Sequence, residues 1–255
     1  MDILAVSNVS KHYGGLAANS EVTCGIREGE IVSLIGPNGA GKTTLFNLIS
    51  GVEKADCGTI EYAGRAIVGL EPPEIARLGL VRTFQQTKIF RDVKVKEAVM
   101  IGRHIHDRTR FLGALLPSRS ARLERRSGIE KVSGILTFLG MSSQAESVAR
   151  YLAYGDQKLL GIAISLAAEP KLLLLDEPAA GLNIQESARL VEIIRRIRDK
   201  GITIGLVEHN MKLVMNISDR VLVMNYGKLI AEGTPGQVRK DPGVIEAYLG
   251  KSGNA

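Results

Sequence analysis

Three short runs of apolar residues lack the polar alternation of a half-exposed strand. They occupy residues 30–35, 171–175 and 202–207, and leucine, isoleucine and valine dominate each of them. Runs of this length and composition are typical of strands buried on both faces of a parallel sheet. A helix-forming stretch, residues 42–50, follows the first run after a glycine-rich turn. The pattern therefore predicts a strand–loop–helix unit at the start of the core.

An amphipathic helix is predicted between the second and third of these strands. Apolar side chains recur at helical spacing at Leu190, Ile194 and Ile197, and most arginines of this stretch lie off the apolar stripe. Asn183, followed three positions later by Glu186, has the pattern of a capping box at the start of the helix. Strand, helix and strand in this order are the repeating unit of a parallel α/β sheet.

Antiparallel and helical regions surround this core. Residues 1–30 read as a strand–turn–strand pair broken by two glycines, and residues 220–225 and 228–231 read as a hairpin. Residues from about 88 to about 165 are mostly helical in pattern, which predicts an inserted helical subdomain within a single domain spanning residues 1–255.

Composition narrows the class of protein. The 255 residues are 45% hydrophobic with a net charge of +6, which fits a folded α/β protein and excludes a disordered or collagenous chain. No apolar run approaches the ~18 residues of a spanning helix, and the acidic second residue does not fit a secretory signal, so we expect a cytosolic chain. The two cysteines are expected to be reduced and without function.

The positive charge is concentrated in residues 101–131, which hold eight basic and three acidic residues. A solvated helix or loop is the first interpretation, and contact with a partner or a lipid headgroup is the second. Nucleic acid is the least favoured, because the rest of the chain is close to neutral.

A phosphate-binding loop is predicted at residues 36–43. Their sequence, Gly-Pro-Asn-Gly-Ala-Gly-Lys-Thr, matches the pattern G-x-x-x-x-G-K-[ST] between a strand and a helix. Glycines let backbone N–H groups turn toward a polyphosphate, and the helix N-terminus adds its positive dipole. We expect Lys42 to reach the β- and γ-phosphates and Thr43 to ligate Mg²⁺. The nucleotide-binding candidates here are Gly36, Asn38, Gly39, Ala40, Gly41, Lys42, Thr43 and Thr44.

A pair of carboxylates ends the second predicted strand. Asp176 and Glu177 directly follow residues 171–175. Such a pair by itself is more often a turn or a helix cap, but the phosphate loop upstream favours a catalytic role. We assign Asp176 to Mg²⁺ and Glu177 to polarising the attacking water as general base.

Together with five further features in order, these residues resemble the nucleotide-binding subunit of an ABC transporter over essentially the whole chain. Residues 152–157 occupy the position of the family's signature segment, and residues 180–183 that of the loop linking two active sites. The resemblance implies an α/β P-loop NTPase core of RecA-like type, with an N-terminal antiparallel β subdomain and an inserted α-helical subdomain.

The resemblance also implies roles for single residues. Tyr13 matches the aromatic residue that stacks on adenine, Gln85 the glutamine that touches Mg²⁺ and the attacking water, and His209 the histidine that senses the γ-phosphate. The family clamps ATP between two head-to-tail subunits. The signature candidates that would complete the second subunit's site are Ala153, Tyr154, Gly155 and Asp156.

Several positions depart from the family pattern, among them Leu159, Gly161 and Ile164 beyond the signature segment. Ala153 lacks a hydroxyl, Tyr154 replaces a glycine, and Asp156 brings an acid toward phosphate, so we expect slow hydrolysis. Asn183 replaces a common aspartate in the loop linking the sites. Because Glu177 is intact, the chain is predicted to be an active ATPase.

The finer resemblance is to the branched-chain amino acid importers, and to the larger of their two ATPase subunits. It rests on Tyr154, residues 45–51, 82–85, 179–183 and 244–250, and the basic stretch 102–127. It implies ATP and Mg²⁺ as cofactors and a location in the cytoplasm, on the inner face of the cell membrane.

The implied partners are two permease membrane subunits, a second homologous ATPase subunit or a homodimer, and indirectly a periplasmic solute-binding protein; no nucleic acid is expected. The solute stays open among branched-chain amino acids, amides, urea and aromatic acids. The alternatives are a regulatory ABC-type ATP-binding module, or a nucleic-acid-associated ATPase not coupled to transport.

Overall fold

The computed structural model describes residues 2–83, 91–106 and 119–249, and the chain divides into two compact units. Residues 1–82 and 171–255 form the first, here called the α/β unit. Residues 83–170 form the second, here called the helical unit. The two are described separately.

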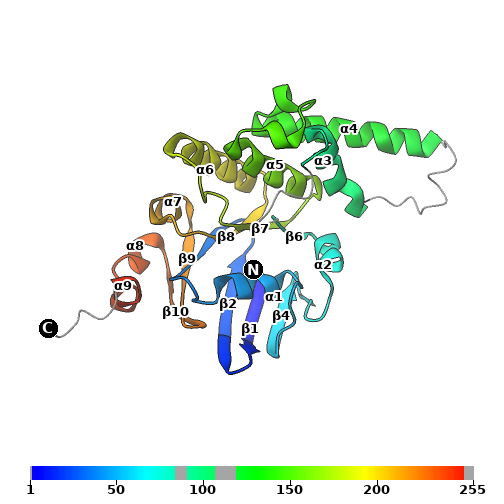
Figure 1. The fold of residues 1–255 in the computed structure, drawn as a ribbon. Helices are drawn as coiled ribbons and strands as arrows, with labels where there is room; N and C mark the ends of the chain where they lie inside the picture. Colours follow the sequence, from blue (N-terminus) through cyan, green and yellow to red (C-terminus); the bar gives the residue numbers. More distant parts are fainter. Residues whose placement is uncertain (1, 84–90, 107–118, 250–255) are drawn as a thin grey trace. The chain divides into compact units, whose positions relative to one another are not determined.

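The α/β unit is built on a six-stranded sheet (Figure 1). Its strands are β3 (Ile31–Ile35), β6 (Leu80–Arg82), β7 (Leu172–Asp176), β8 (Thr203–Val207), β9 (Arg220–Asn225) and β10 (Lys228–Gly233). Their order in the sheet is β10-β9-β3-β8-β7-β6; β10 is antiparallel to its neighbour and all other pairs are parallel. Every residue of β3, β7 and β8 is buried, which confirms the prediction of fully buried parallel strands.

A second, four-stranded antiparallel sheet belongs to the same unit. It has the order β2-β1-β4-β5 and consists of β1 (Asp2–Tyr13), β2 (Leu16–Arg27), β4 (Cys57–Tyr62) and β5 (Arg65–Ala66). The predicted strand–turn–strand start of the chain is therefore confirmed by β1 and β2.

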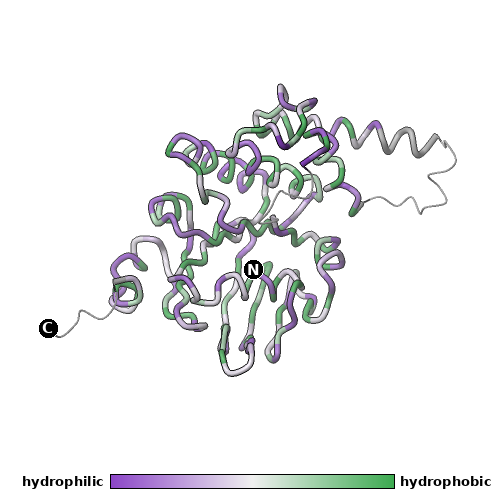
Figure 2. Tube along the Cα trace, viewed as in Figure 1, coloured by the Kyte–Doolittle hydropathy of each residue, from purple (hydrophilic) through white to green (hydrophobic). Residues whose placement is uncertain are grey.

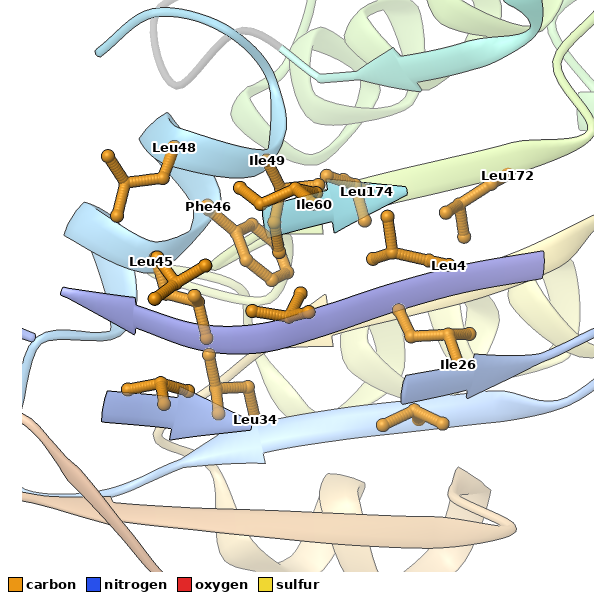
Figure 3. Packing of buried hydrophobic residues seen from close by; sticks show 14 of the residues in the cluster. Leu4, Ile26, Leu34, Leu45, Phe46, Leu48, Ile49, Ile60, Leu172 and Leu174 are labelled. Carbon is orange, nitrogen blue, oxygen red and sulfur yellow. The ribbon is translucent and has the colours of Figure 1, made fainter. Parts of the chain in front are cut away.

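Helix α1 (Lys42–Ile49) joins the two sheets into one hydrophobic core. Leu45 and Phe46 of this helix belong to one cluster with Leu4 of β1 and with Leu172 and Leu174 of β7 (Figure 3). The start of α1, which follows the predicted phosphate loop, is thus anchored to both sheets through the apolar face of the helix.

The remaining helices of this unit are α2 (Pro72–Leu78), α6 (Ile184–Asp199), α7 (Met211–Ile217), α8 (Pro235–Val238) and α9 (Pro242–Leu249). Figure 2 shows hydrophilic and hydrophobic residues along α6, and Leu190, Ile194 and Ile197 belong to its buried stripe, together with Val191 and Ile193. The predicted capping box is present, because Asn183 and Glu186 each accept a hydrogen bond from the other's backbone N–H at 2.9 Å.

The described part of the helical unit contains α3 (Val95–Gly102), α4 (Arg119–Leu139) and α5 (Tyr154–Ala167). Three short 3₁₀ turns, Arg103–His106, Ser142–Gln144 and Ala149–Tyr151, lie between them. Helices α3 and α5 approach closely at Gly102, where a Cβ atom would lie 2.1 Å from the Ile164 carbonyl oxygen. No helix within 2–83, 91–106 and 119–249 is long and apolar enough to cross a membrane.

Candidate functional site

The predicted phosphate loop has a backbone that only glycine allows at its two ends. Gly36 has a φ of 150°, and a Cβ there would lie 2.1 Å from the Met224 carbonyl oxygen. Gly41 has a φ of 98°, and its Cβ would lie 2.2 Å from the Ala18 carbonyl oxygen. The loop is thus packed against β9 and β2, and its glycines serve conformation and close approach together.

Lys42 is buried inside this loop, with 5% of its surface exposed. Its Nζ donates hydrogen bonds to the carbonyl oxygens of Gly36 at 2.8 Å and Pro37 at 2.9 Å. Burial lowers the pKa of Lys42, and the negative charges of Glu177 and Asp176 act in the opposite direction. The loop lysine and the carboxylate pair therefore influence one another electrostatically, as a shared site requires.

Asp176 ends β7, and solvent does not reach its side chain. Arg82, at the end of the neighbouring strand β6, donates a hydrogen bond from Nη2 to Asp176 Oδ2 at 2.6 Å. The other nitrogen of this guanidinium, Nη1, donates to Asn47 Oδ1 at 2.6 Å and Ser50 Oγ at 3.2 Å at the end of α1. Arg82 thus ties the metal-binding candidate to the helix that follows the phosphate loop.

Glu177 has an unusual backbone conformation, with a φ of 46°. Its N–H donates to the Val207 carbonyl oxygen at 2.9 Å, which continues the pairing of β7 with β8 by one residue. Its Oε1 lies 2.8 Å from His209 Nε2. The two residues predicted as base and γ-phosphate sensor are therefore in direct contact, at the carboxyl ends of adjacent parallel strands, where ligands bind in open α/β sheets.

Tyr13 is half-exposed at the end of β1, and its hydroxyl contacts the Glu53 carboxylate. Glu53 also accepts a hydrogen bond from Asn47 Nδ2 at 2.6 Å. Because Asn47 lies on α1 and also contacts Arg82, polar contacts run from the predicted base-stacking residue to Asp176.

The signature candidates lie at the start of α5 in the helical unit. Ala153 is its N-cap residue, without a side-chain cap, and Tyr154 is 52% exposed. Asp156 Oδ2 accepts a hydrogen bond from Gln144 Nε2 at 2.6 Å, so its carboxylate has a partner within the same unit. An acidic residue in the first turn also suits the positive end of the helix dipole. Gln85 lies outside the described residues.

Sequence reasoning missed Glu208, the residue between β8 and His209. This glutamate is 3% exposed, and its carboxylate accepts hydrogen bonds from backbone N–H groups on both sides of the site. Its position directly before the histidine was the available signal. Arg82 was noticed only as part of residues 82–85, because its partner lies 94 positions away.

The donor set fits Mg²⁺ with a polyphosphate. Thr43 and Asp176 offer a hydroxyl and a carboxylate, which are the hard oxygen ligands that this ion takes, usually one or two from protein. Lys42 supplies positive charge inside a loop of backbone N–H groups. Within residues 2–83, 91–106 and 119–249, no group of three or more histidine, cysteine, aspartate or glutamate side chains could hold a metal ion, so the phosphates would have to supply further ligands.

The fold and this site define a P-loop nucleotide-binding domain. The family model described as ABC transporter matches residues 20–180, and that described as branched-chain amino acid ATP-binding cassette transporter matches residues 228–253. The chain is 44% identical to the high-affinity branched-chain amino acid transport ATP-binding protein LivG of Salmonella typhimurium and 42% identical to BraF of Pseudomonas aeruginosa, with 98% of each chain covered in both comparisons.

The structure agrees with these relatives. A crystal structure of a nucleotide-free ATP-binding cassette from an ABC transporter matches with a TM-score of 0.86 and 34% identity, over 98% of this chain and 100% of that one. The chain belongs to the ABC transporter family, among the branched-chain amino acid transport ATP-binding proteins. The predicted fold class and the predicted ABC-type ATPase are thereby confirmed.

Proposed function

We propose that the chain hydrolyses MgATP with Glu177 as the general base and Asp176 as a ligand of the metal. The observation that carries this proposal is the contact between His209 Nε2 and Glu177 Oε1 at 2.8 Å, beside the buried Lys42. The bound Mg²⁺ would neutralise charge on the β- and γ-phosphate oxygens, held by Thr43, Asp176 and, as proposed from the family resemblance, Gln85.

The protein residues then perform three tasks. Lys42 and the backbone N–H groups of the phosphate loop hold the β- and γ-phosphates. Glu177 accepts a proton from the attacking water on a carboxylate oxygen, and the oxygen of that water forms the new bond to the γ-phosphorus. The bond between the γ-phosphorus and the bridging oxygen breaks, and ADP leaves with that oxygen. His209 orients the Glu177 carboxylate and contacts the γ-phosphate.

A second subunit completes the site in this proposal. Tyr13 stacks on adenine, while the first turn of α5, at Ala153, Tyr154, Gly155 and Asp156, presents its N–H groups to the γ-phosphate held by the other subunit. The 14-residue length of α5 gives its N-terminus a full dipole. The hydrogen bond from Gln144 to Asp156 supports the predicted activity, because it turns part of the acidic charge toward the chain itself.

The relatives support a proposal for the transported solute and for the partners. We propose uptake of branched-chain amino acids or related small polar solutes, through two permease subunits and with a second ATPase subunit, at the inner face of the cell membrane. A periplasmic solute-binding protein would deliver the solute.

The test is the ATPase rate of the full chain, assembled with the partner ATPase and permease subunits proposed above, with and without the Glu177→Gln substitution. Loss of the base is expected to lower the turnover number at least about 100-fold, while MgATP still binds. Glu192→Gln, an exposed position on α6, is the matched control for the removed charge and should keep the parent rate. A parent rate equal to that of Glu177→Gln would refute the proposal.

A further inference from the structure

Glu208 is a buried carboxylate whose hydrogen bonds join two loops. Its Oε1 accepts from the backbone N–H of Ala179 at 2.7 Å, in the loop after β7. Its Oε2 accepts from the backbone N–H groups of His209 at 3.1 Å and Asn210 at 3.3 Å, in the loop after β8. Burying a carboxylate is costly unless its oxygens are satisfied, and here backbone donors of both loops contribute.

These contacts belong to a closed ring of interactions. Glu177 is joined to β8 by its N–H bond to the Val207 carbonyl oxygen, and to the following loop by its side-chain contact with His209. Two residues beyond Glu177, Ala179 is joined back to Glu208. The ring therefore joins the loop that carries Glu177 to the loop that carries His209 at two points, Glu177 and Ala179.

The backbone of Glu177 needs such a restraint. A glutamate at a φ of 46° is in the left-handed region of backbone conformation, which residues other than glycine and asparagine adopt only at a cost in free energy. A strained residue persists only where its surroundings hold it. The hydrogen bond from Ala179 to Glu208 holds the segment that leaves Glu177, so it contributes to keeping this turn in place.

We propose that Glu208 is a positioning residue that acts through Glu177 and His209. It holds the loops after β7 and β8 at the separation at which His209 Nε2 meets Glu177 Oε1, without contacting nucleotide itself. This inference rests on the proposed function, since it assigns Glu208 a role in the turnover that Glu177 performs.

The first test is Glu208→Gln in the full chain, assayed with the partner ATPase and permease subunits proposed above. The amide keeps the shape but replaces one accepting oxygen by an NH₂ group, which cannot accept the N–H of Ala179, or those of His209 and Asn210 in the other orientation. Misplacing a catalytic pair slightly is expected to lower kcat at least about tenfold. The Kd for MgATP, measured with a fluorescent nucleotide, should stay within about twofold, because only transition-state interactions are lost.

Thr203→Val is the matched control. Thr203 lies at the other end of β8, is fully buried, and accepts a hydrogen bond from the Gly29 backbone N–H at 3.0 Å through its hydroxyl. Removing this hydroxyl should lower the melting temperature, because a buried hydrogen bond is lost, but should leave kcat unchanged. If Glu208→Gln lowers stability as Thr203→Val does and leaves kcat at the parent value, the proposed role is wrong.

A double-mutant comparison separates positioning from an independent effect. In a Glu177→Gln background, which lacks the residue that Glu208 is proposed to position, adding Glu208→Gln should change kcat by less than about twofold, because residues that act as a unit are not additive. A full additional loss would overturn the proposal.

Glu208→Asp, which keeps the charge but shortens the reach to Ala179, should show the same selective loss of kcat if Glu208→Gln does not fold. If the parent chain, assembled with those partners, fails to hydrolyse MgATP, the proposed function is refuted instead, before Glu208 is tested.

Discussion

Arg82 forms an ion pair with Asp176, whose carboxylate solvent does not reach. The exposed fractions of the two side chains are 14% for Arg82 and 0% for Asp176. Removing one partner of a buried ion pair leaves an uncompensated charge, whereas exposed pairs contribute little. The same guanidinium also orients the Asn47 amide on α1, so its loss would affect two elements of the site.

We expect Arg82→Met to lower the free energy of unfolding by about 3 kcal/mol. The control in the same unit is Arg198→Met, because its partners Asp199 and Asp219 are 62% and 47% exposed and each pair should contribute less than about 1 kcal/mol. Denaturant titration of both variants measures the difference. Equal losses would mean that the Arg82 pair does not behave as a buried one.

The two cysteines also differ in burial, and this difference affects their reactivity. Burial, with the negative charge of Glu232, raises the pKa of Cys24 to about 12, while Cys57 is exposed at the start of β4. A raised pKa keeps the thiol protonated at pH 8, and the thiolate is the reactive form. Iodoacetamide at pH 8 should therefore modify Cys57 and reach Cys24 only after unfolding, as measured by peptide mass spectrometry. Equal labelling of both in the folded chain would contradict this.

At the scale of elements, α6 shows how a departure from the family pattern is accommodated. Asn183 was expected to affect the loop linking two sites, and the structure gives it a local task at the start of this helix. Asparagine and aspartate are similarly good N-cap residues, so either preserves the capping box. The substitution is thus neutral for the helix itself.

Asn183→Ala should destabilise the chain by about 1 kcal/mol, because the Glu186 N–H loses its acceptor. Asn183→Asp should retain the cap and gain a few tenths of a kcal/mol, roughly, from the helix dipole. Gln185→Ala, an exposed position in the same turn, is the control and should change stability by less than about 0.5 kcal/mol. Thermal unfolding monitored by circular dichroism compares them. A larger loss from the control would show that the cap is not responsible.

Local patterns explain why the elements could be predicted. The strands β3, β7 and β8, the hairpin of β9 and β10, and helices α1 and α6 each have their signal within a few residues of sequence. The contacts of Arg82 and Glu208 join residues 94 and 29 positions apart, so only the strand order of the sheet reveals them. The phosphate loop and the carboxylate pair were found because each carries its chemistry in adjacent residues.

At the scale of the whole molecule, nucleotide binding should be measurable as stability. A ligand that binds only the folded chain at 100 times its Kd adds about 2.7 kcal/mol to the free energy of unfolding. The paired-subunit hypothesis adds a second expectation, because MgATP should also favour association. Glu177→Gln should retain both effects, since it removes the proposed base and leaves the phosphate loop intact.

Small-angle scattering of Glu177→Gln should therefore show a larger mass with MgATP than without nucleotide. The sample contains either the partner ATPase or, if the chain forms a homodimer, the chain alone. Lys42→Ala is the control, and its mass should not respond to MgATP. A Glu177→Gln sample that binds MgATP and yet never associates would contradict the paired site.

The left-handed backbone at Glu177 also bears on engineering of this protein. Among the residues that the structure describes, six that are not glycine share this conformation: Asn8, Glu21, Ala63, Glu169, Glu177 and Tyr226. A common stabilising strategy replaces such residues by glycine or asparagine, which relaxes the main chain. At Ala63 that exchange would leave turnover unchanged. At position 177 it would stabilise the fold but remove the proposed base, and with it the ATPase activity.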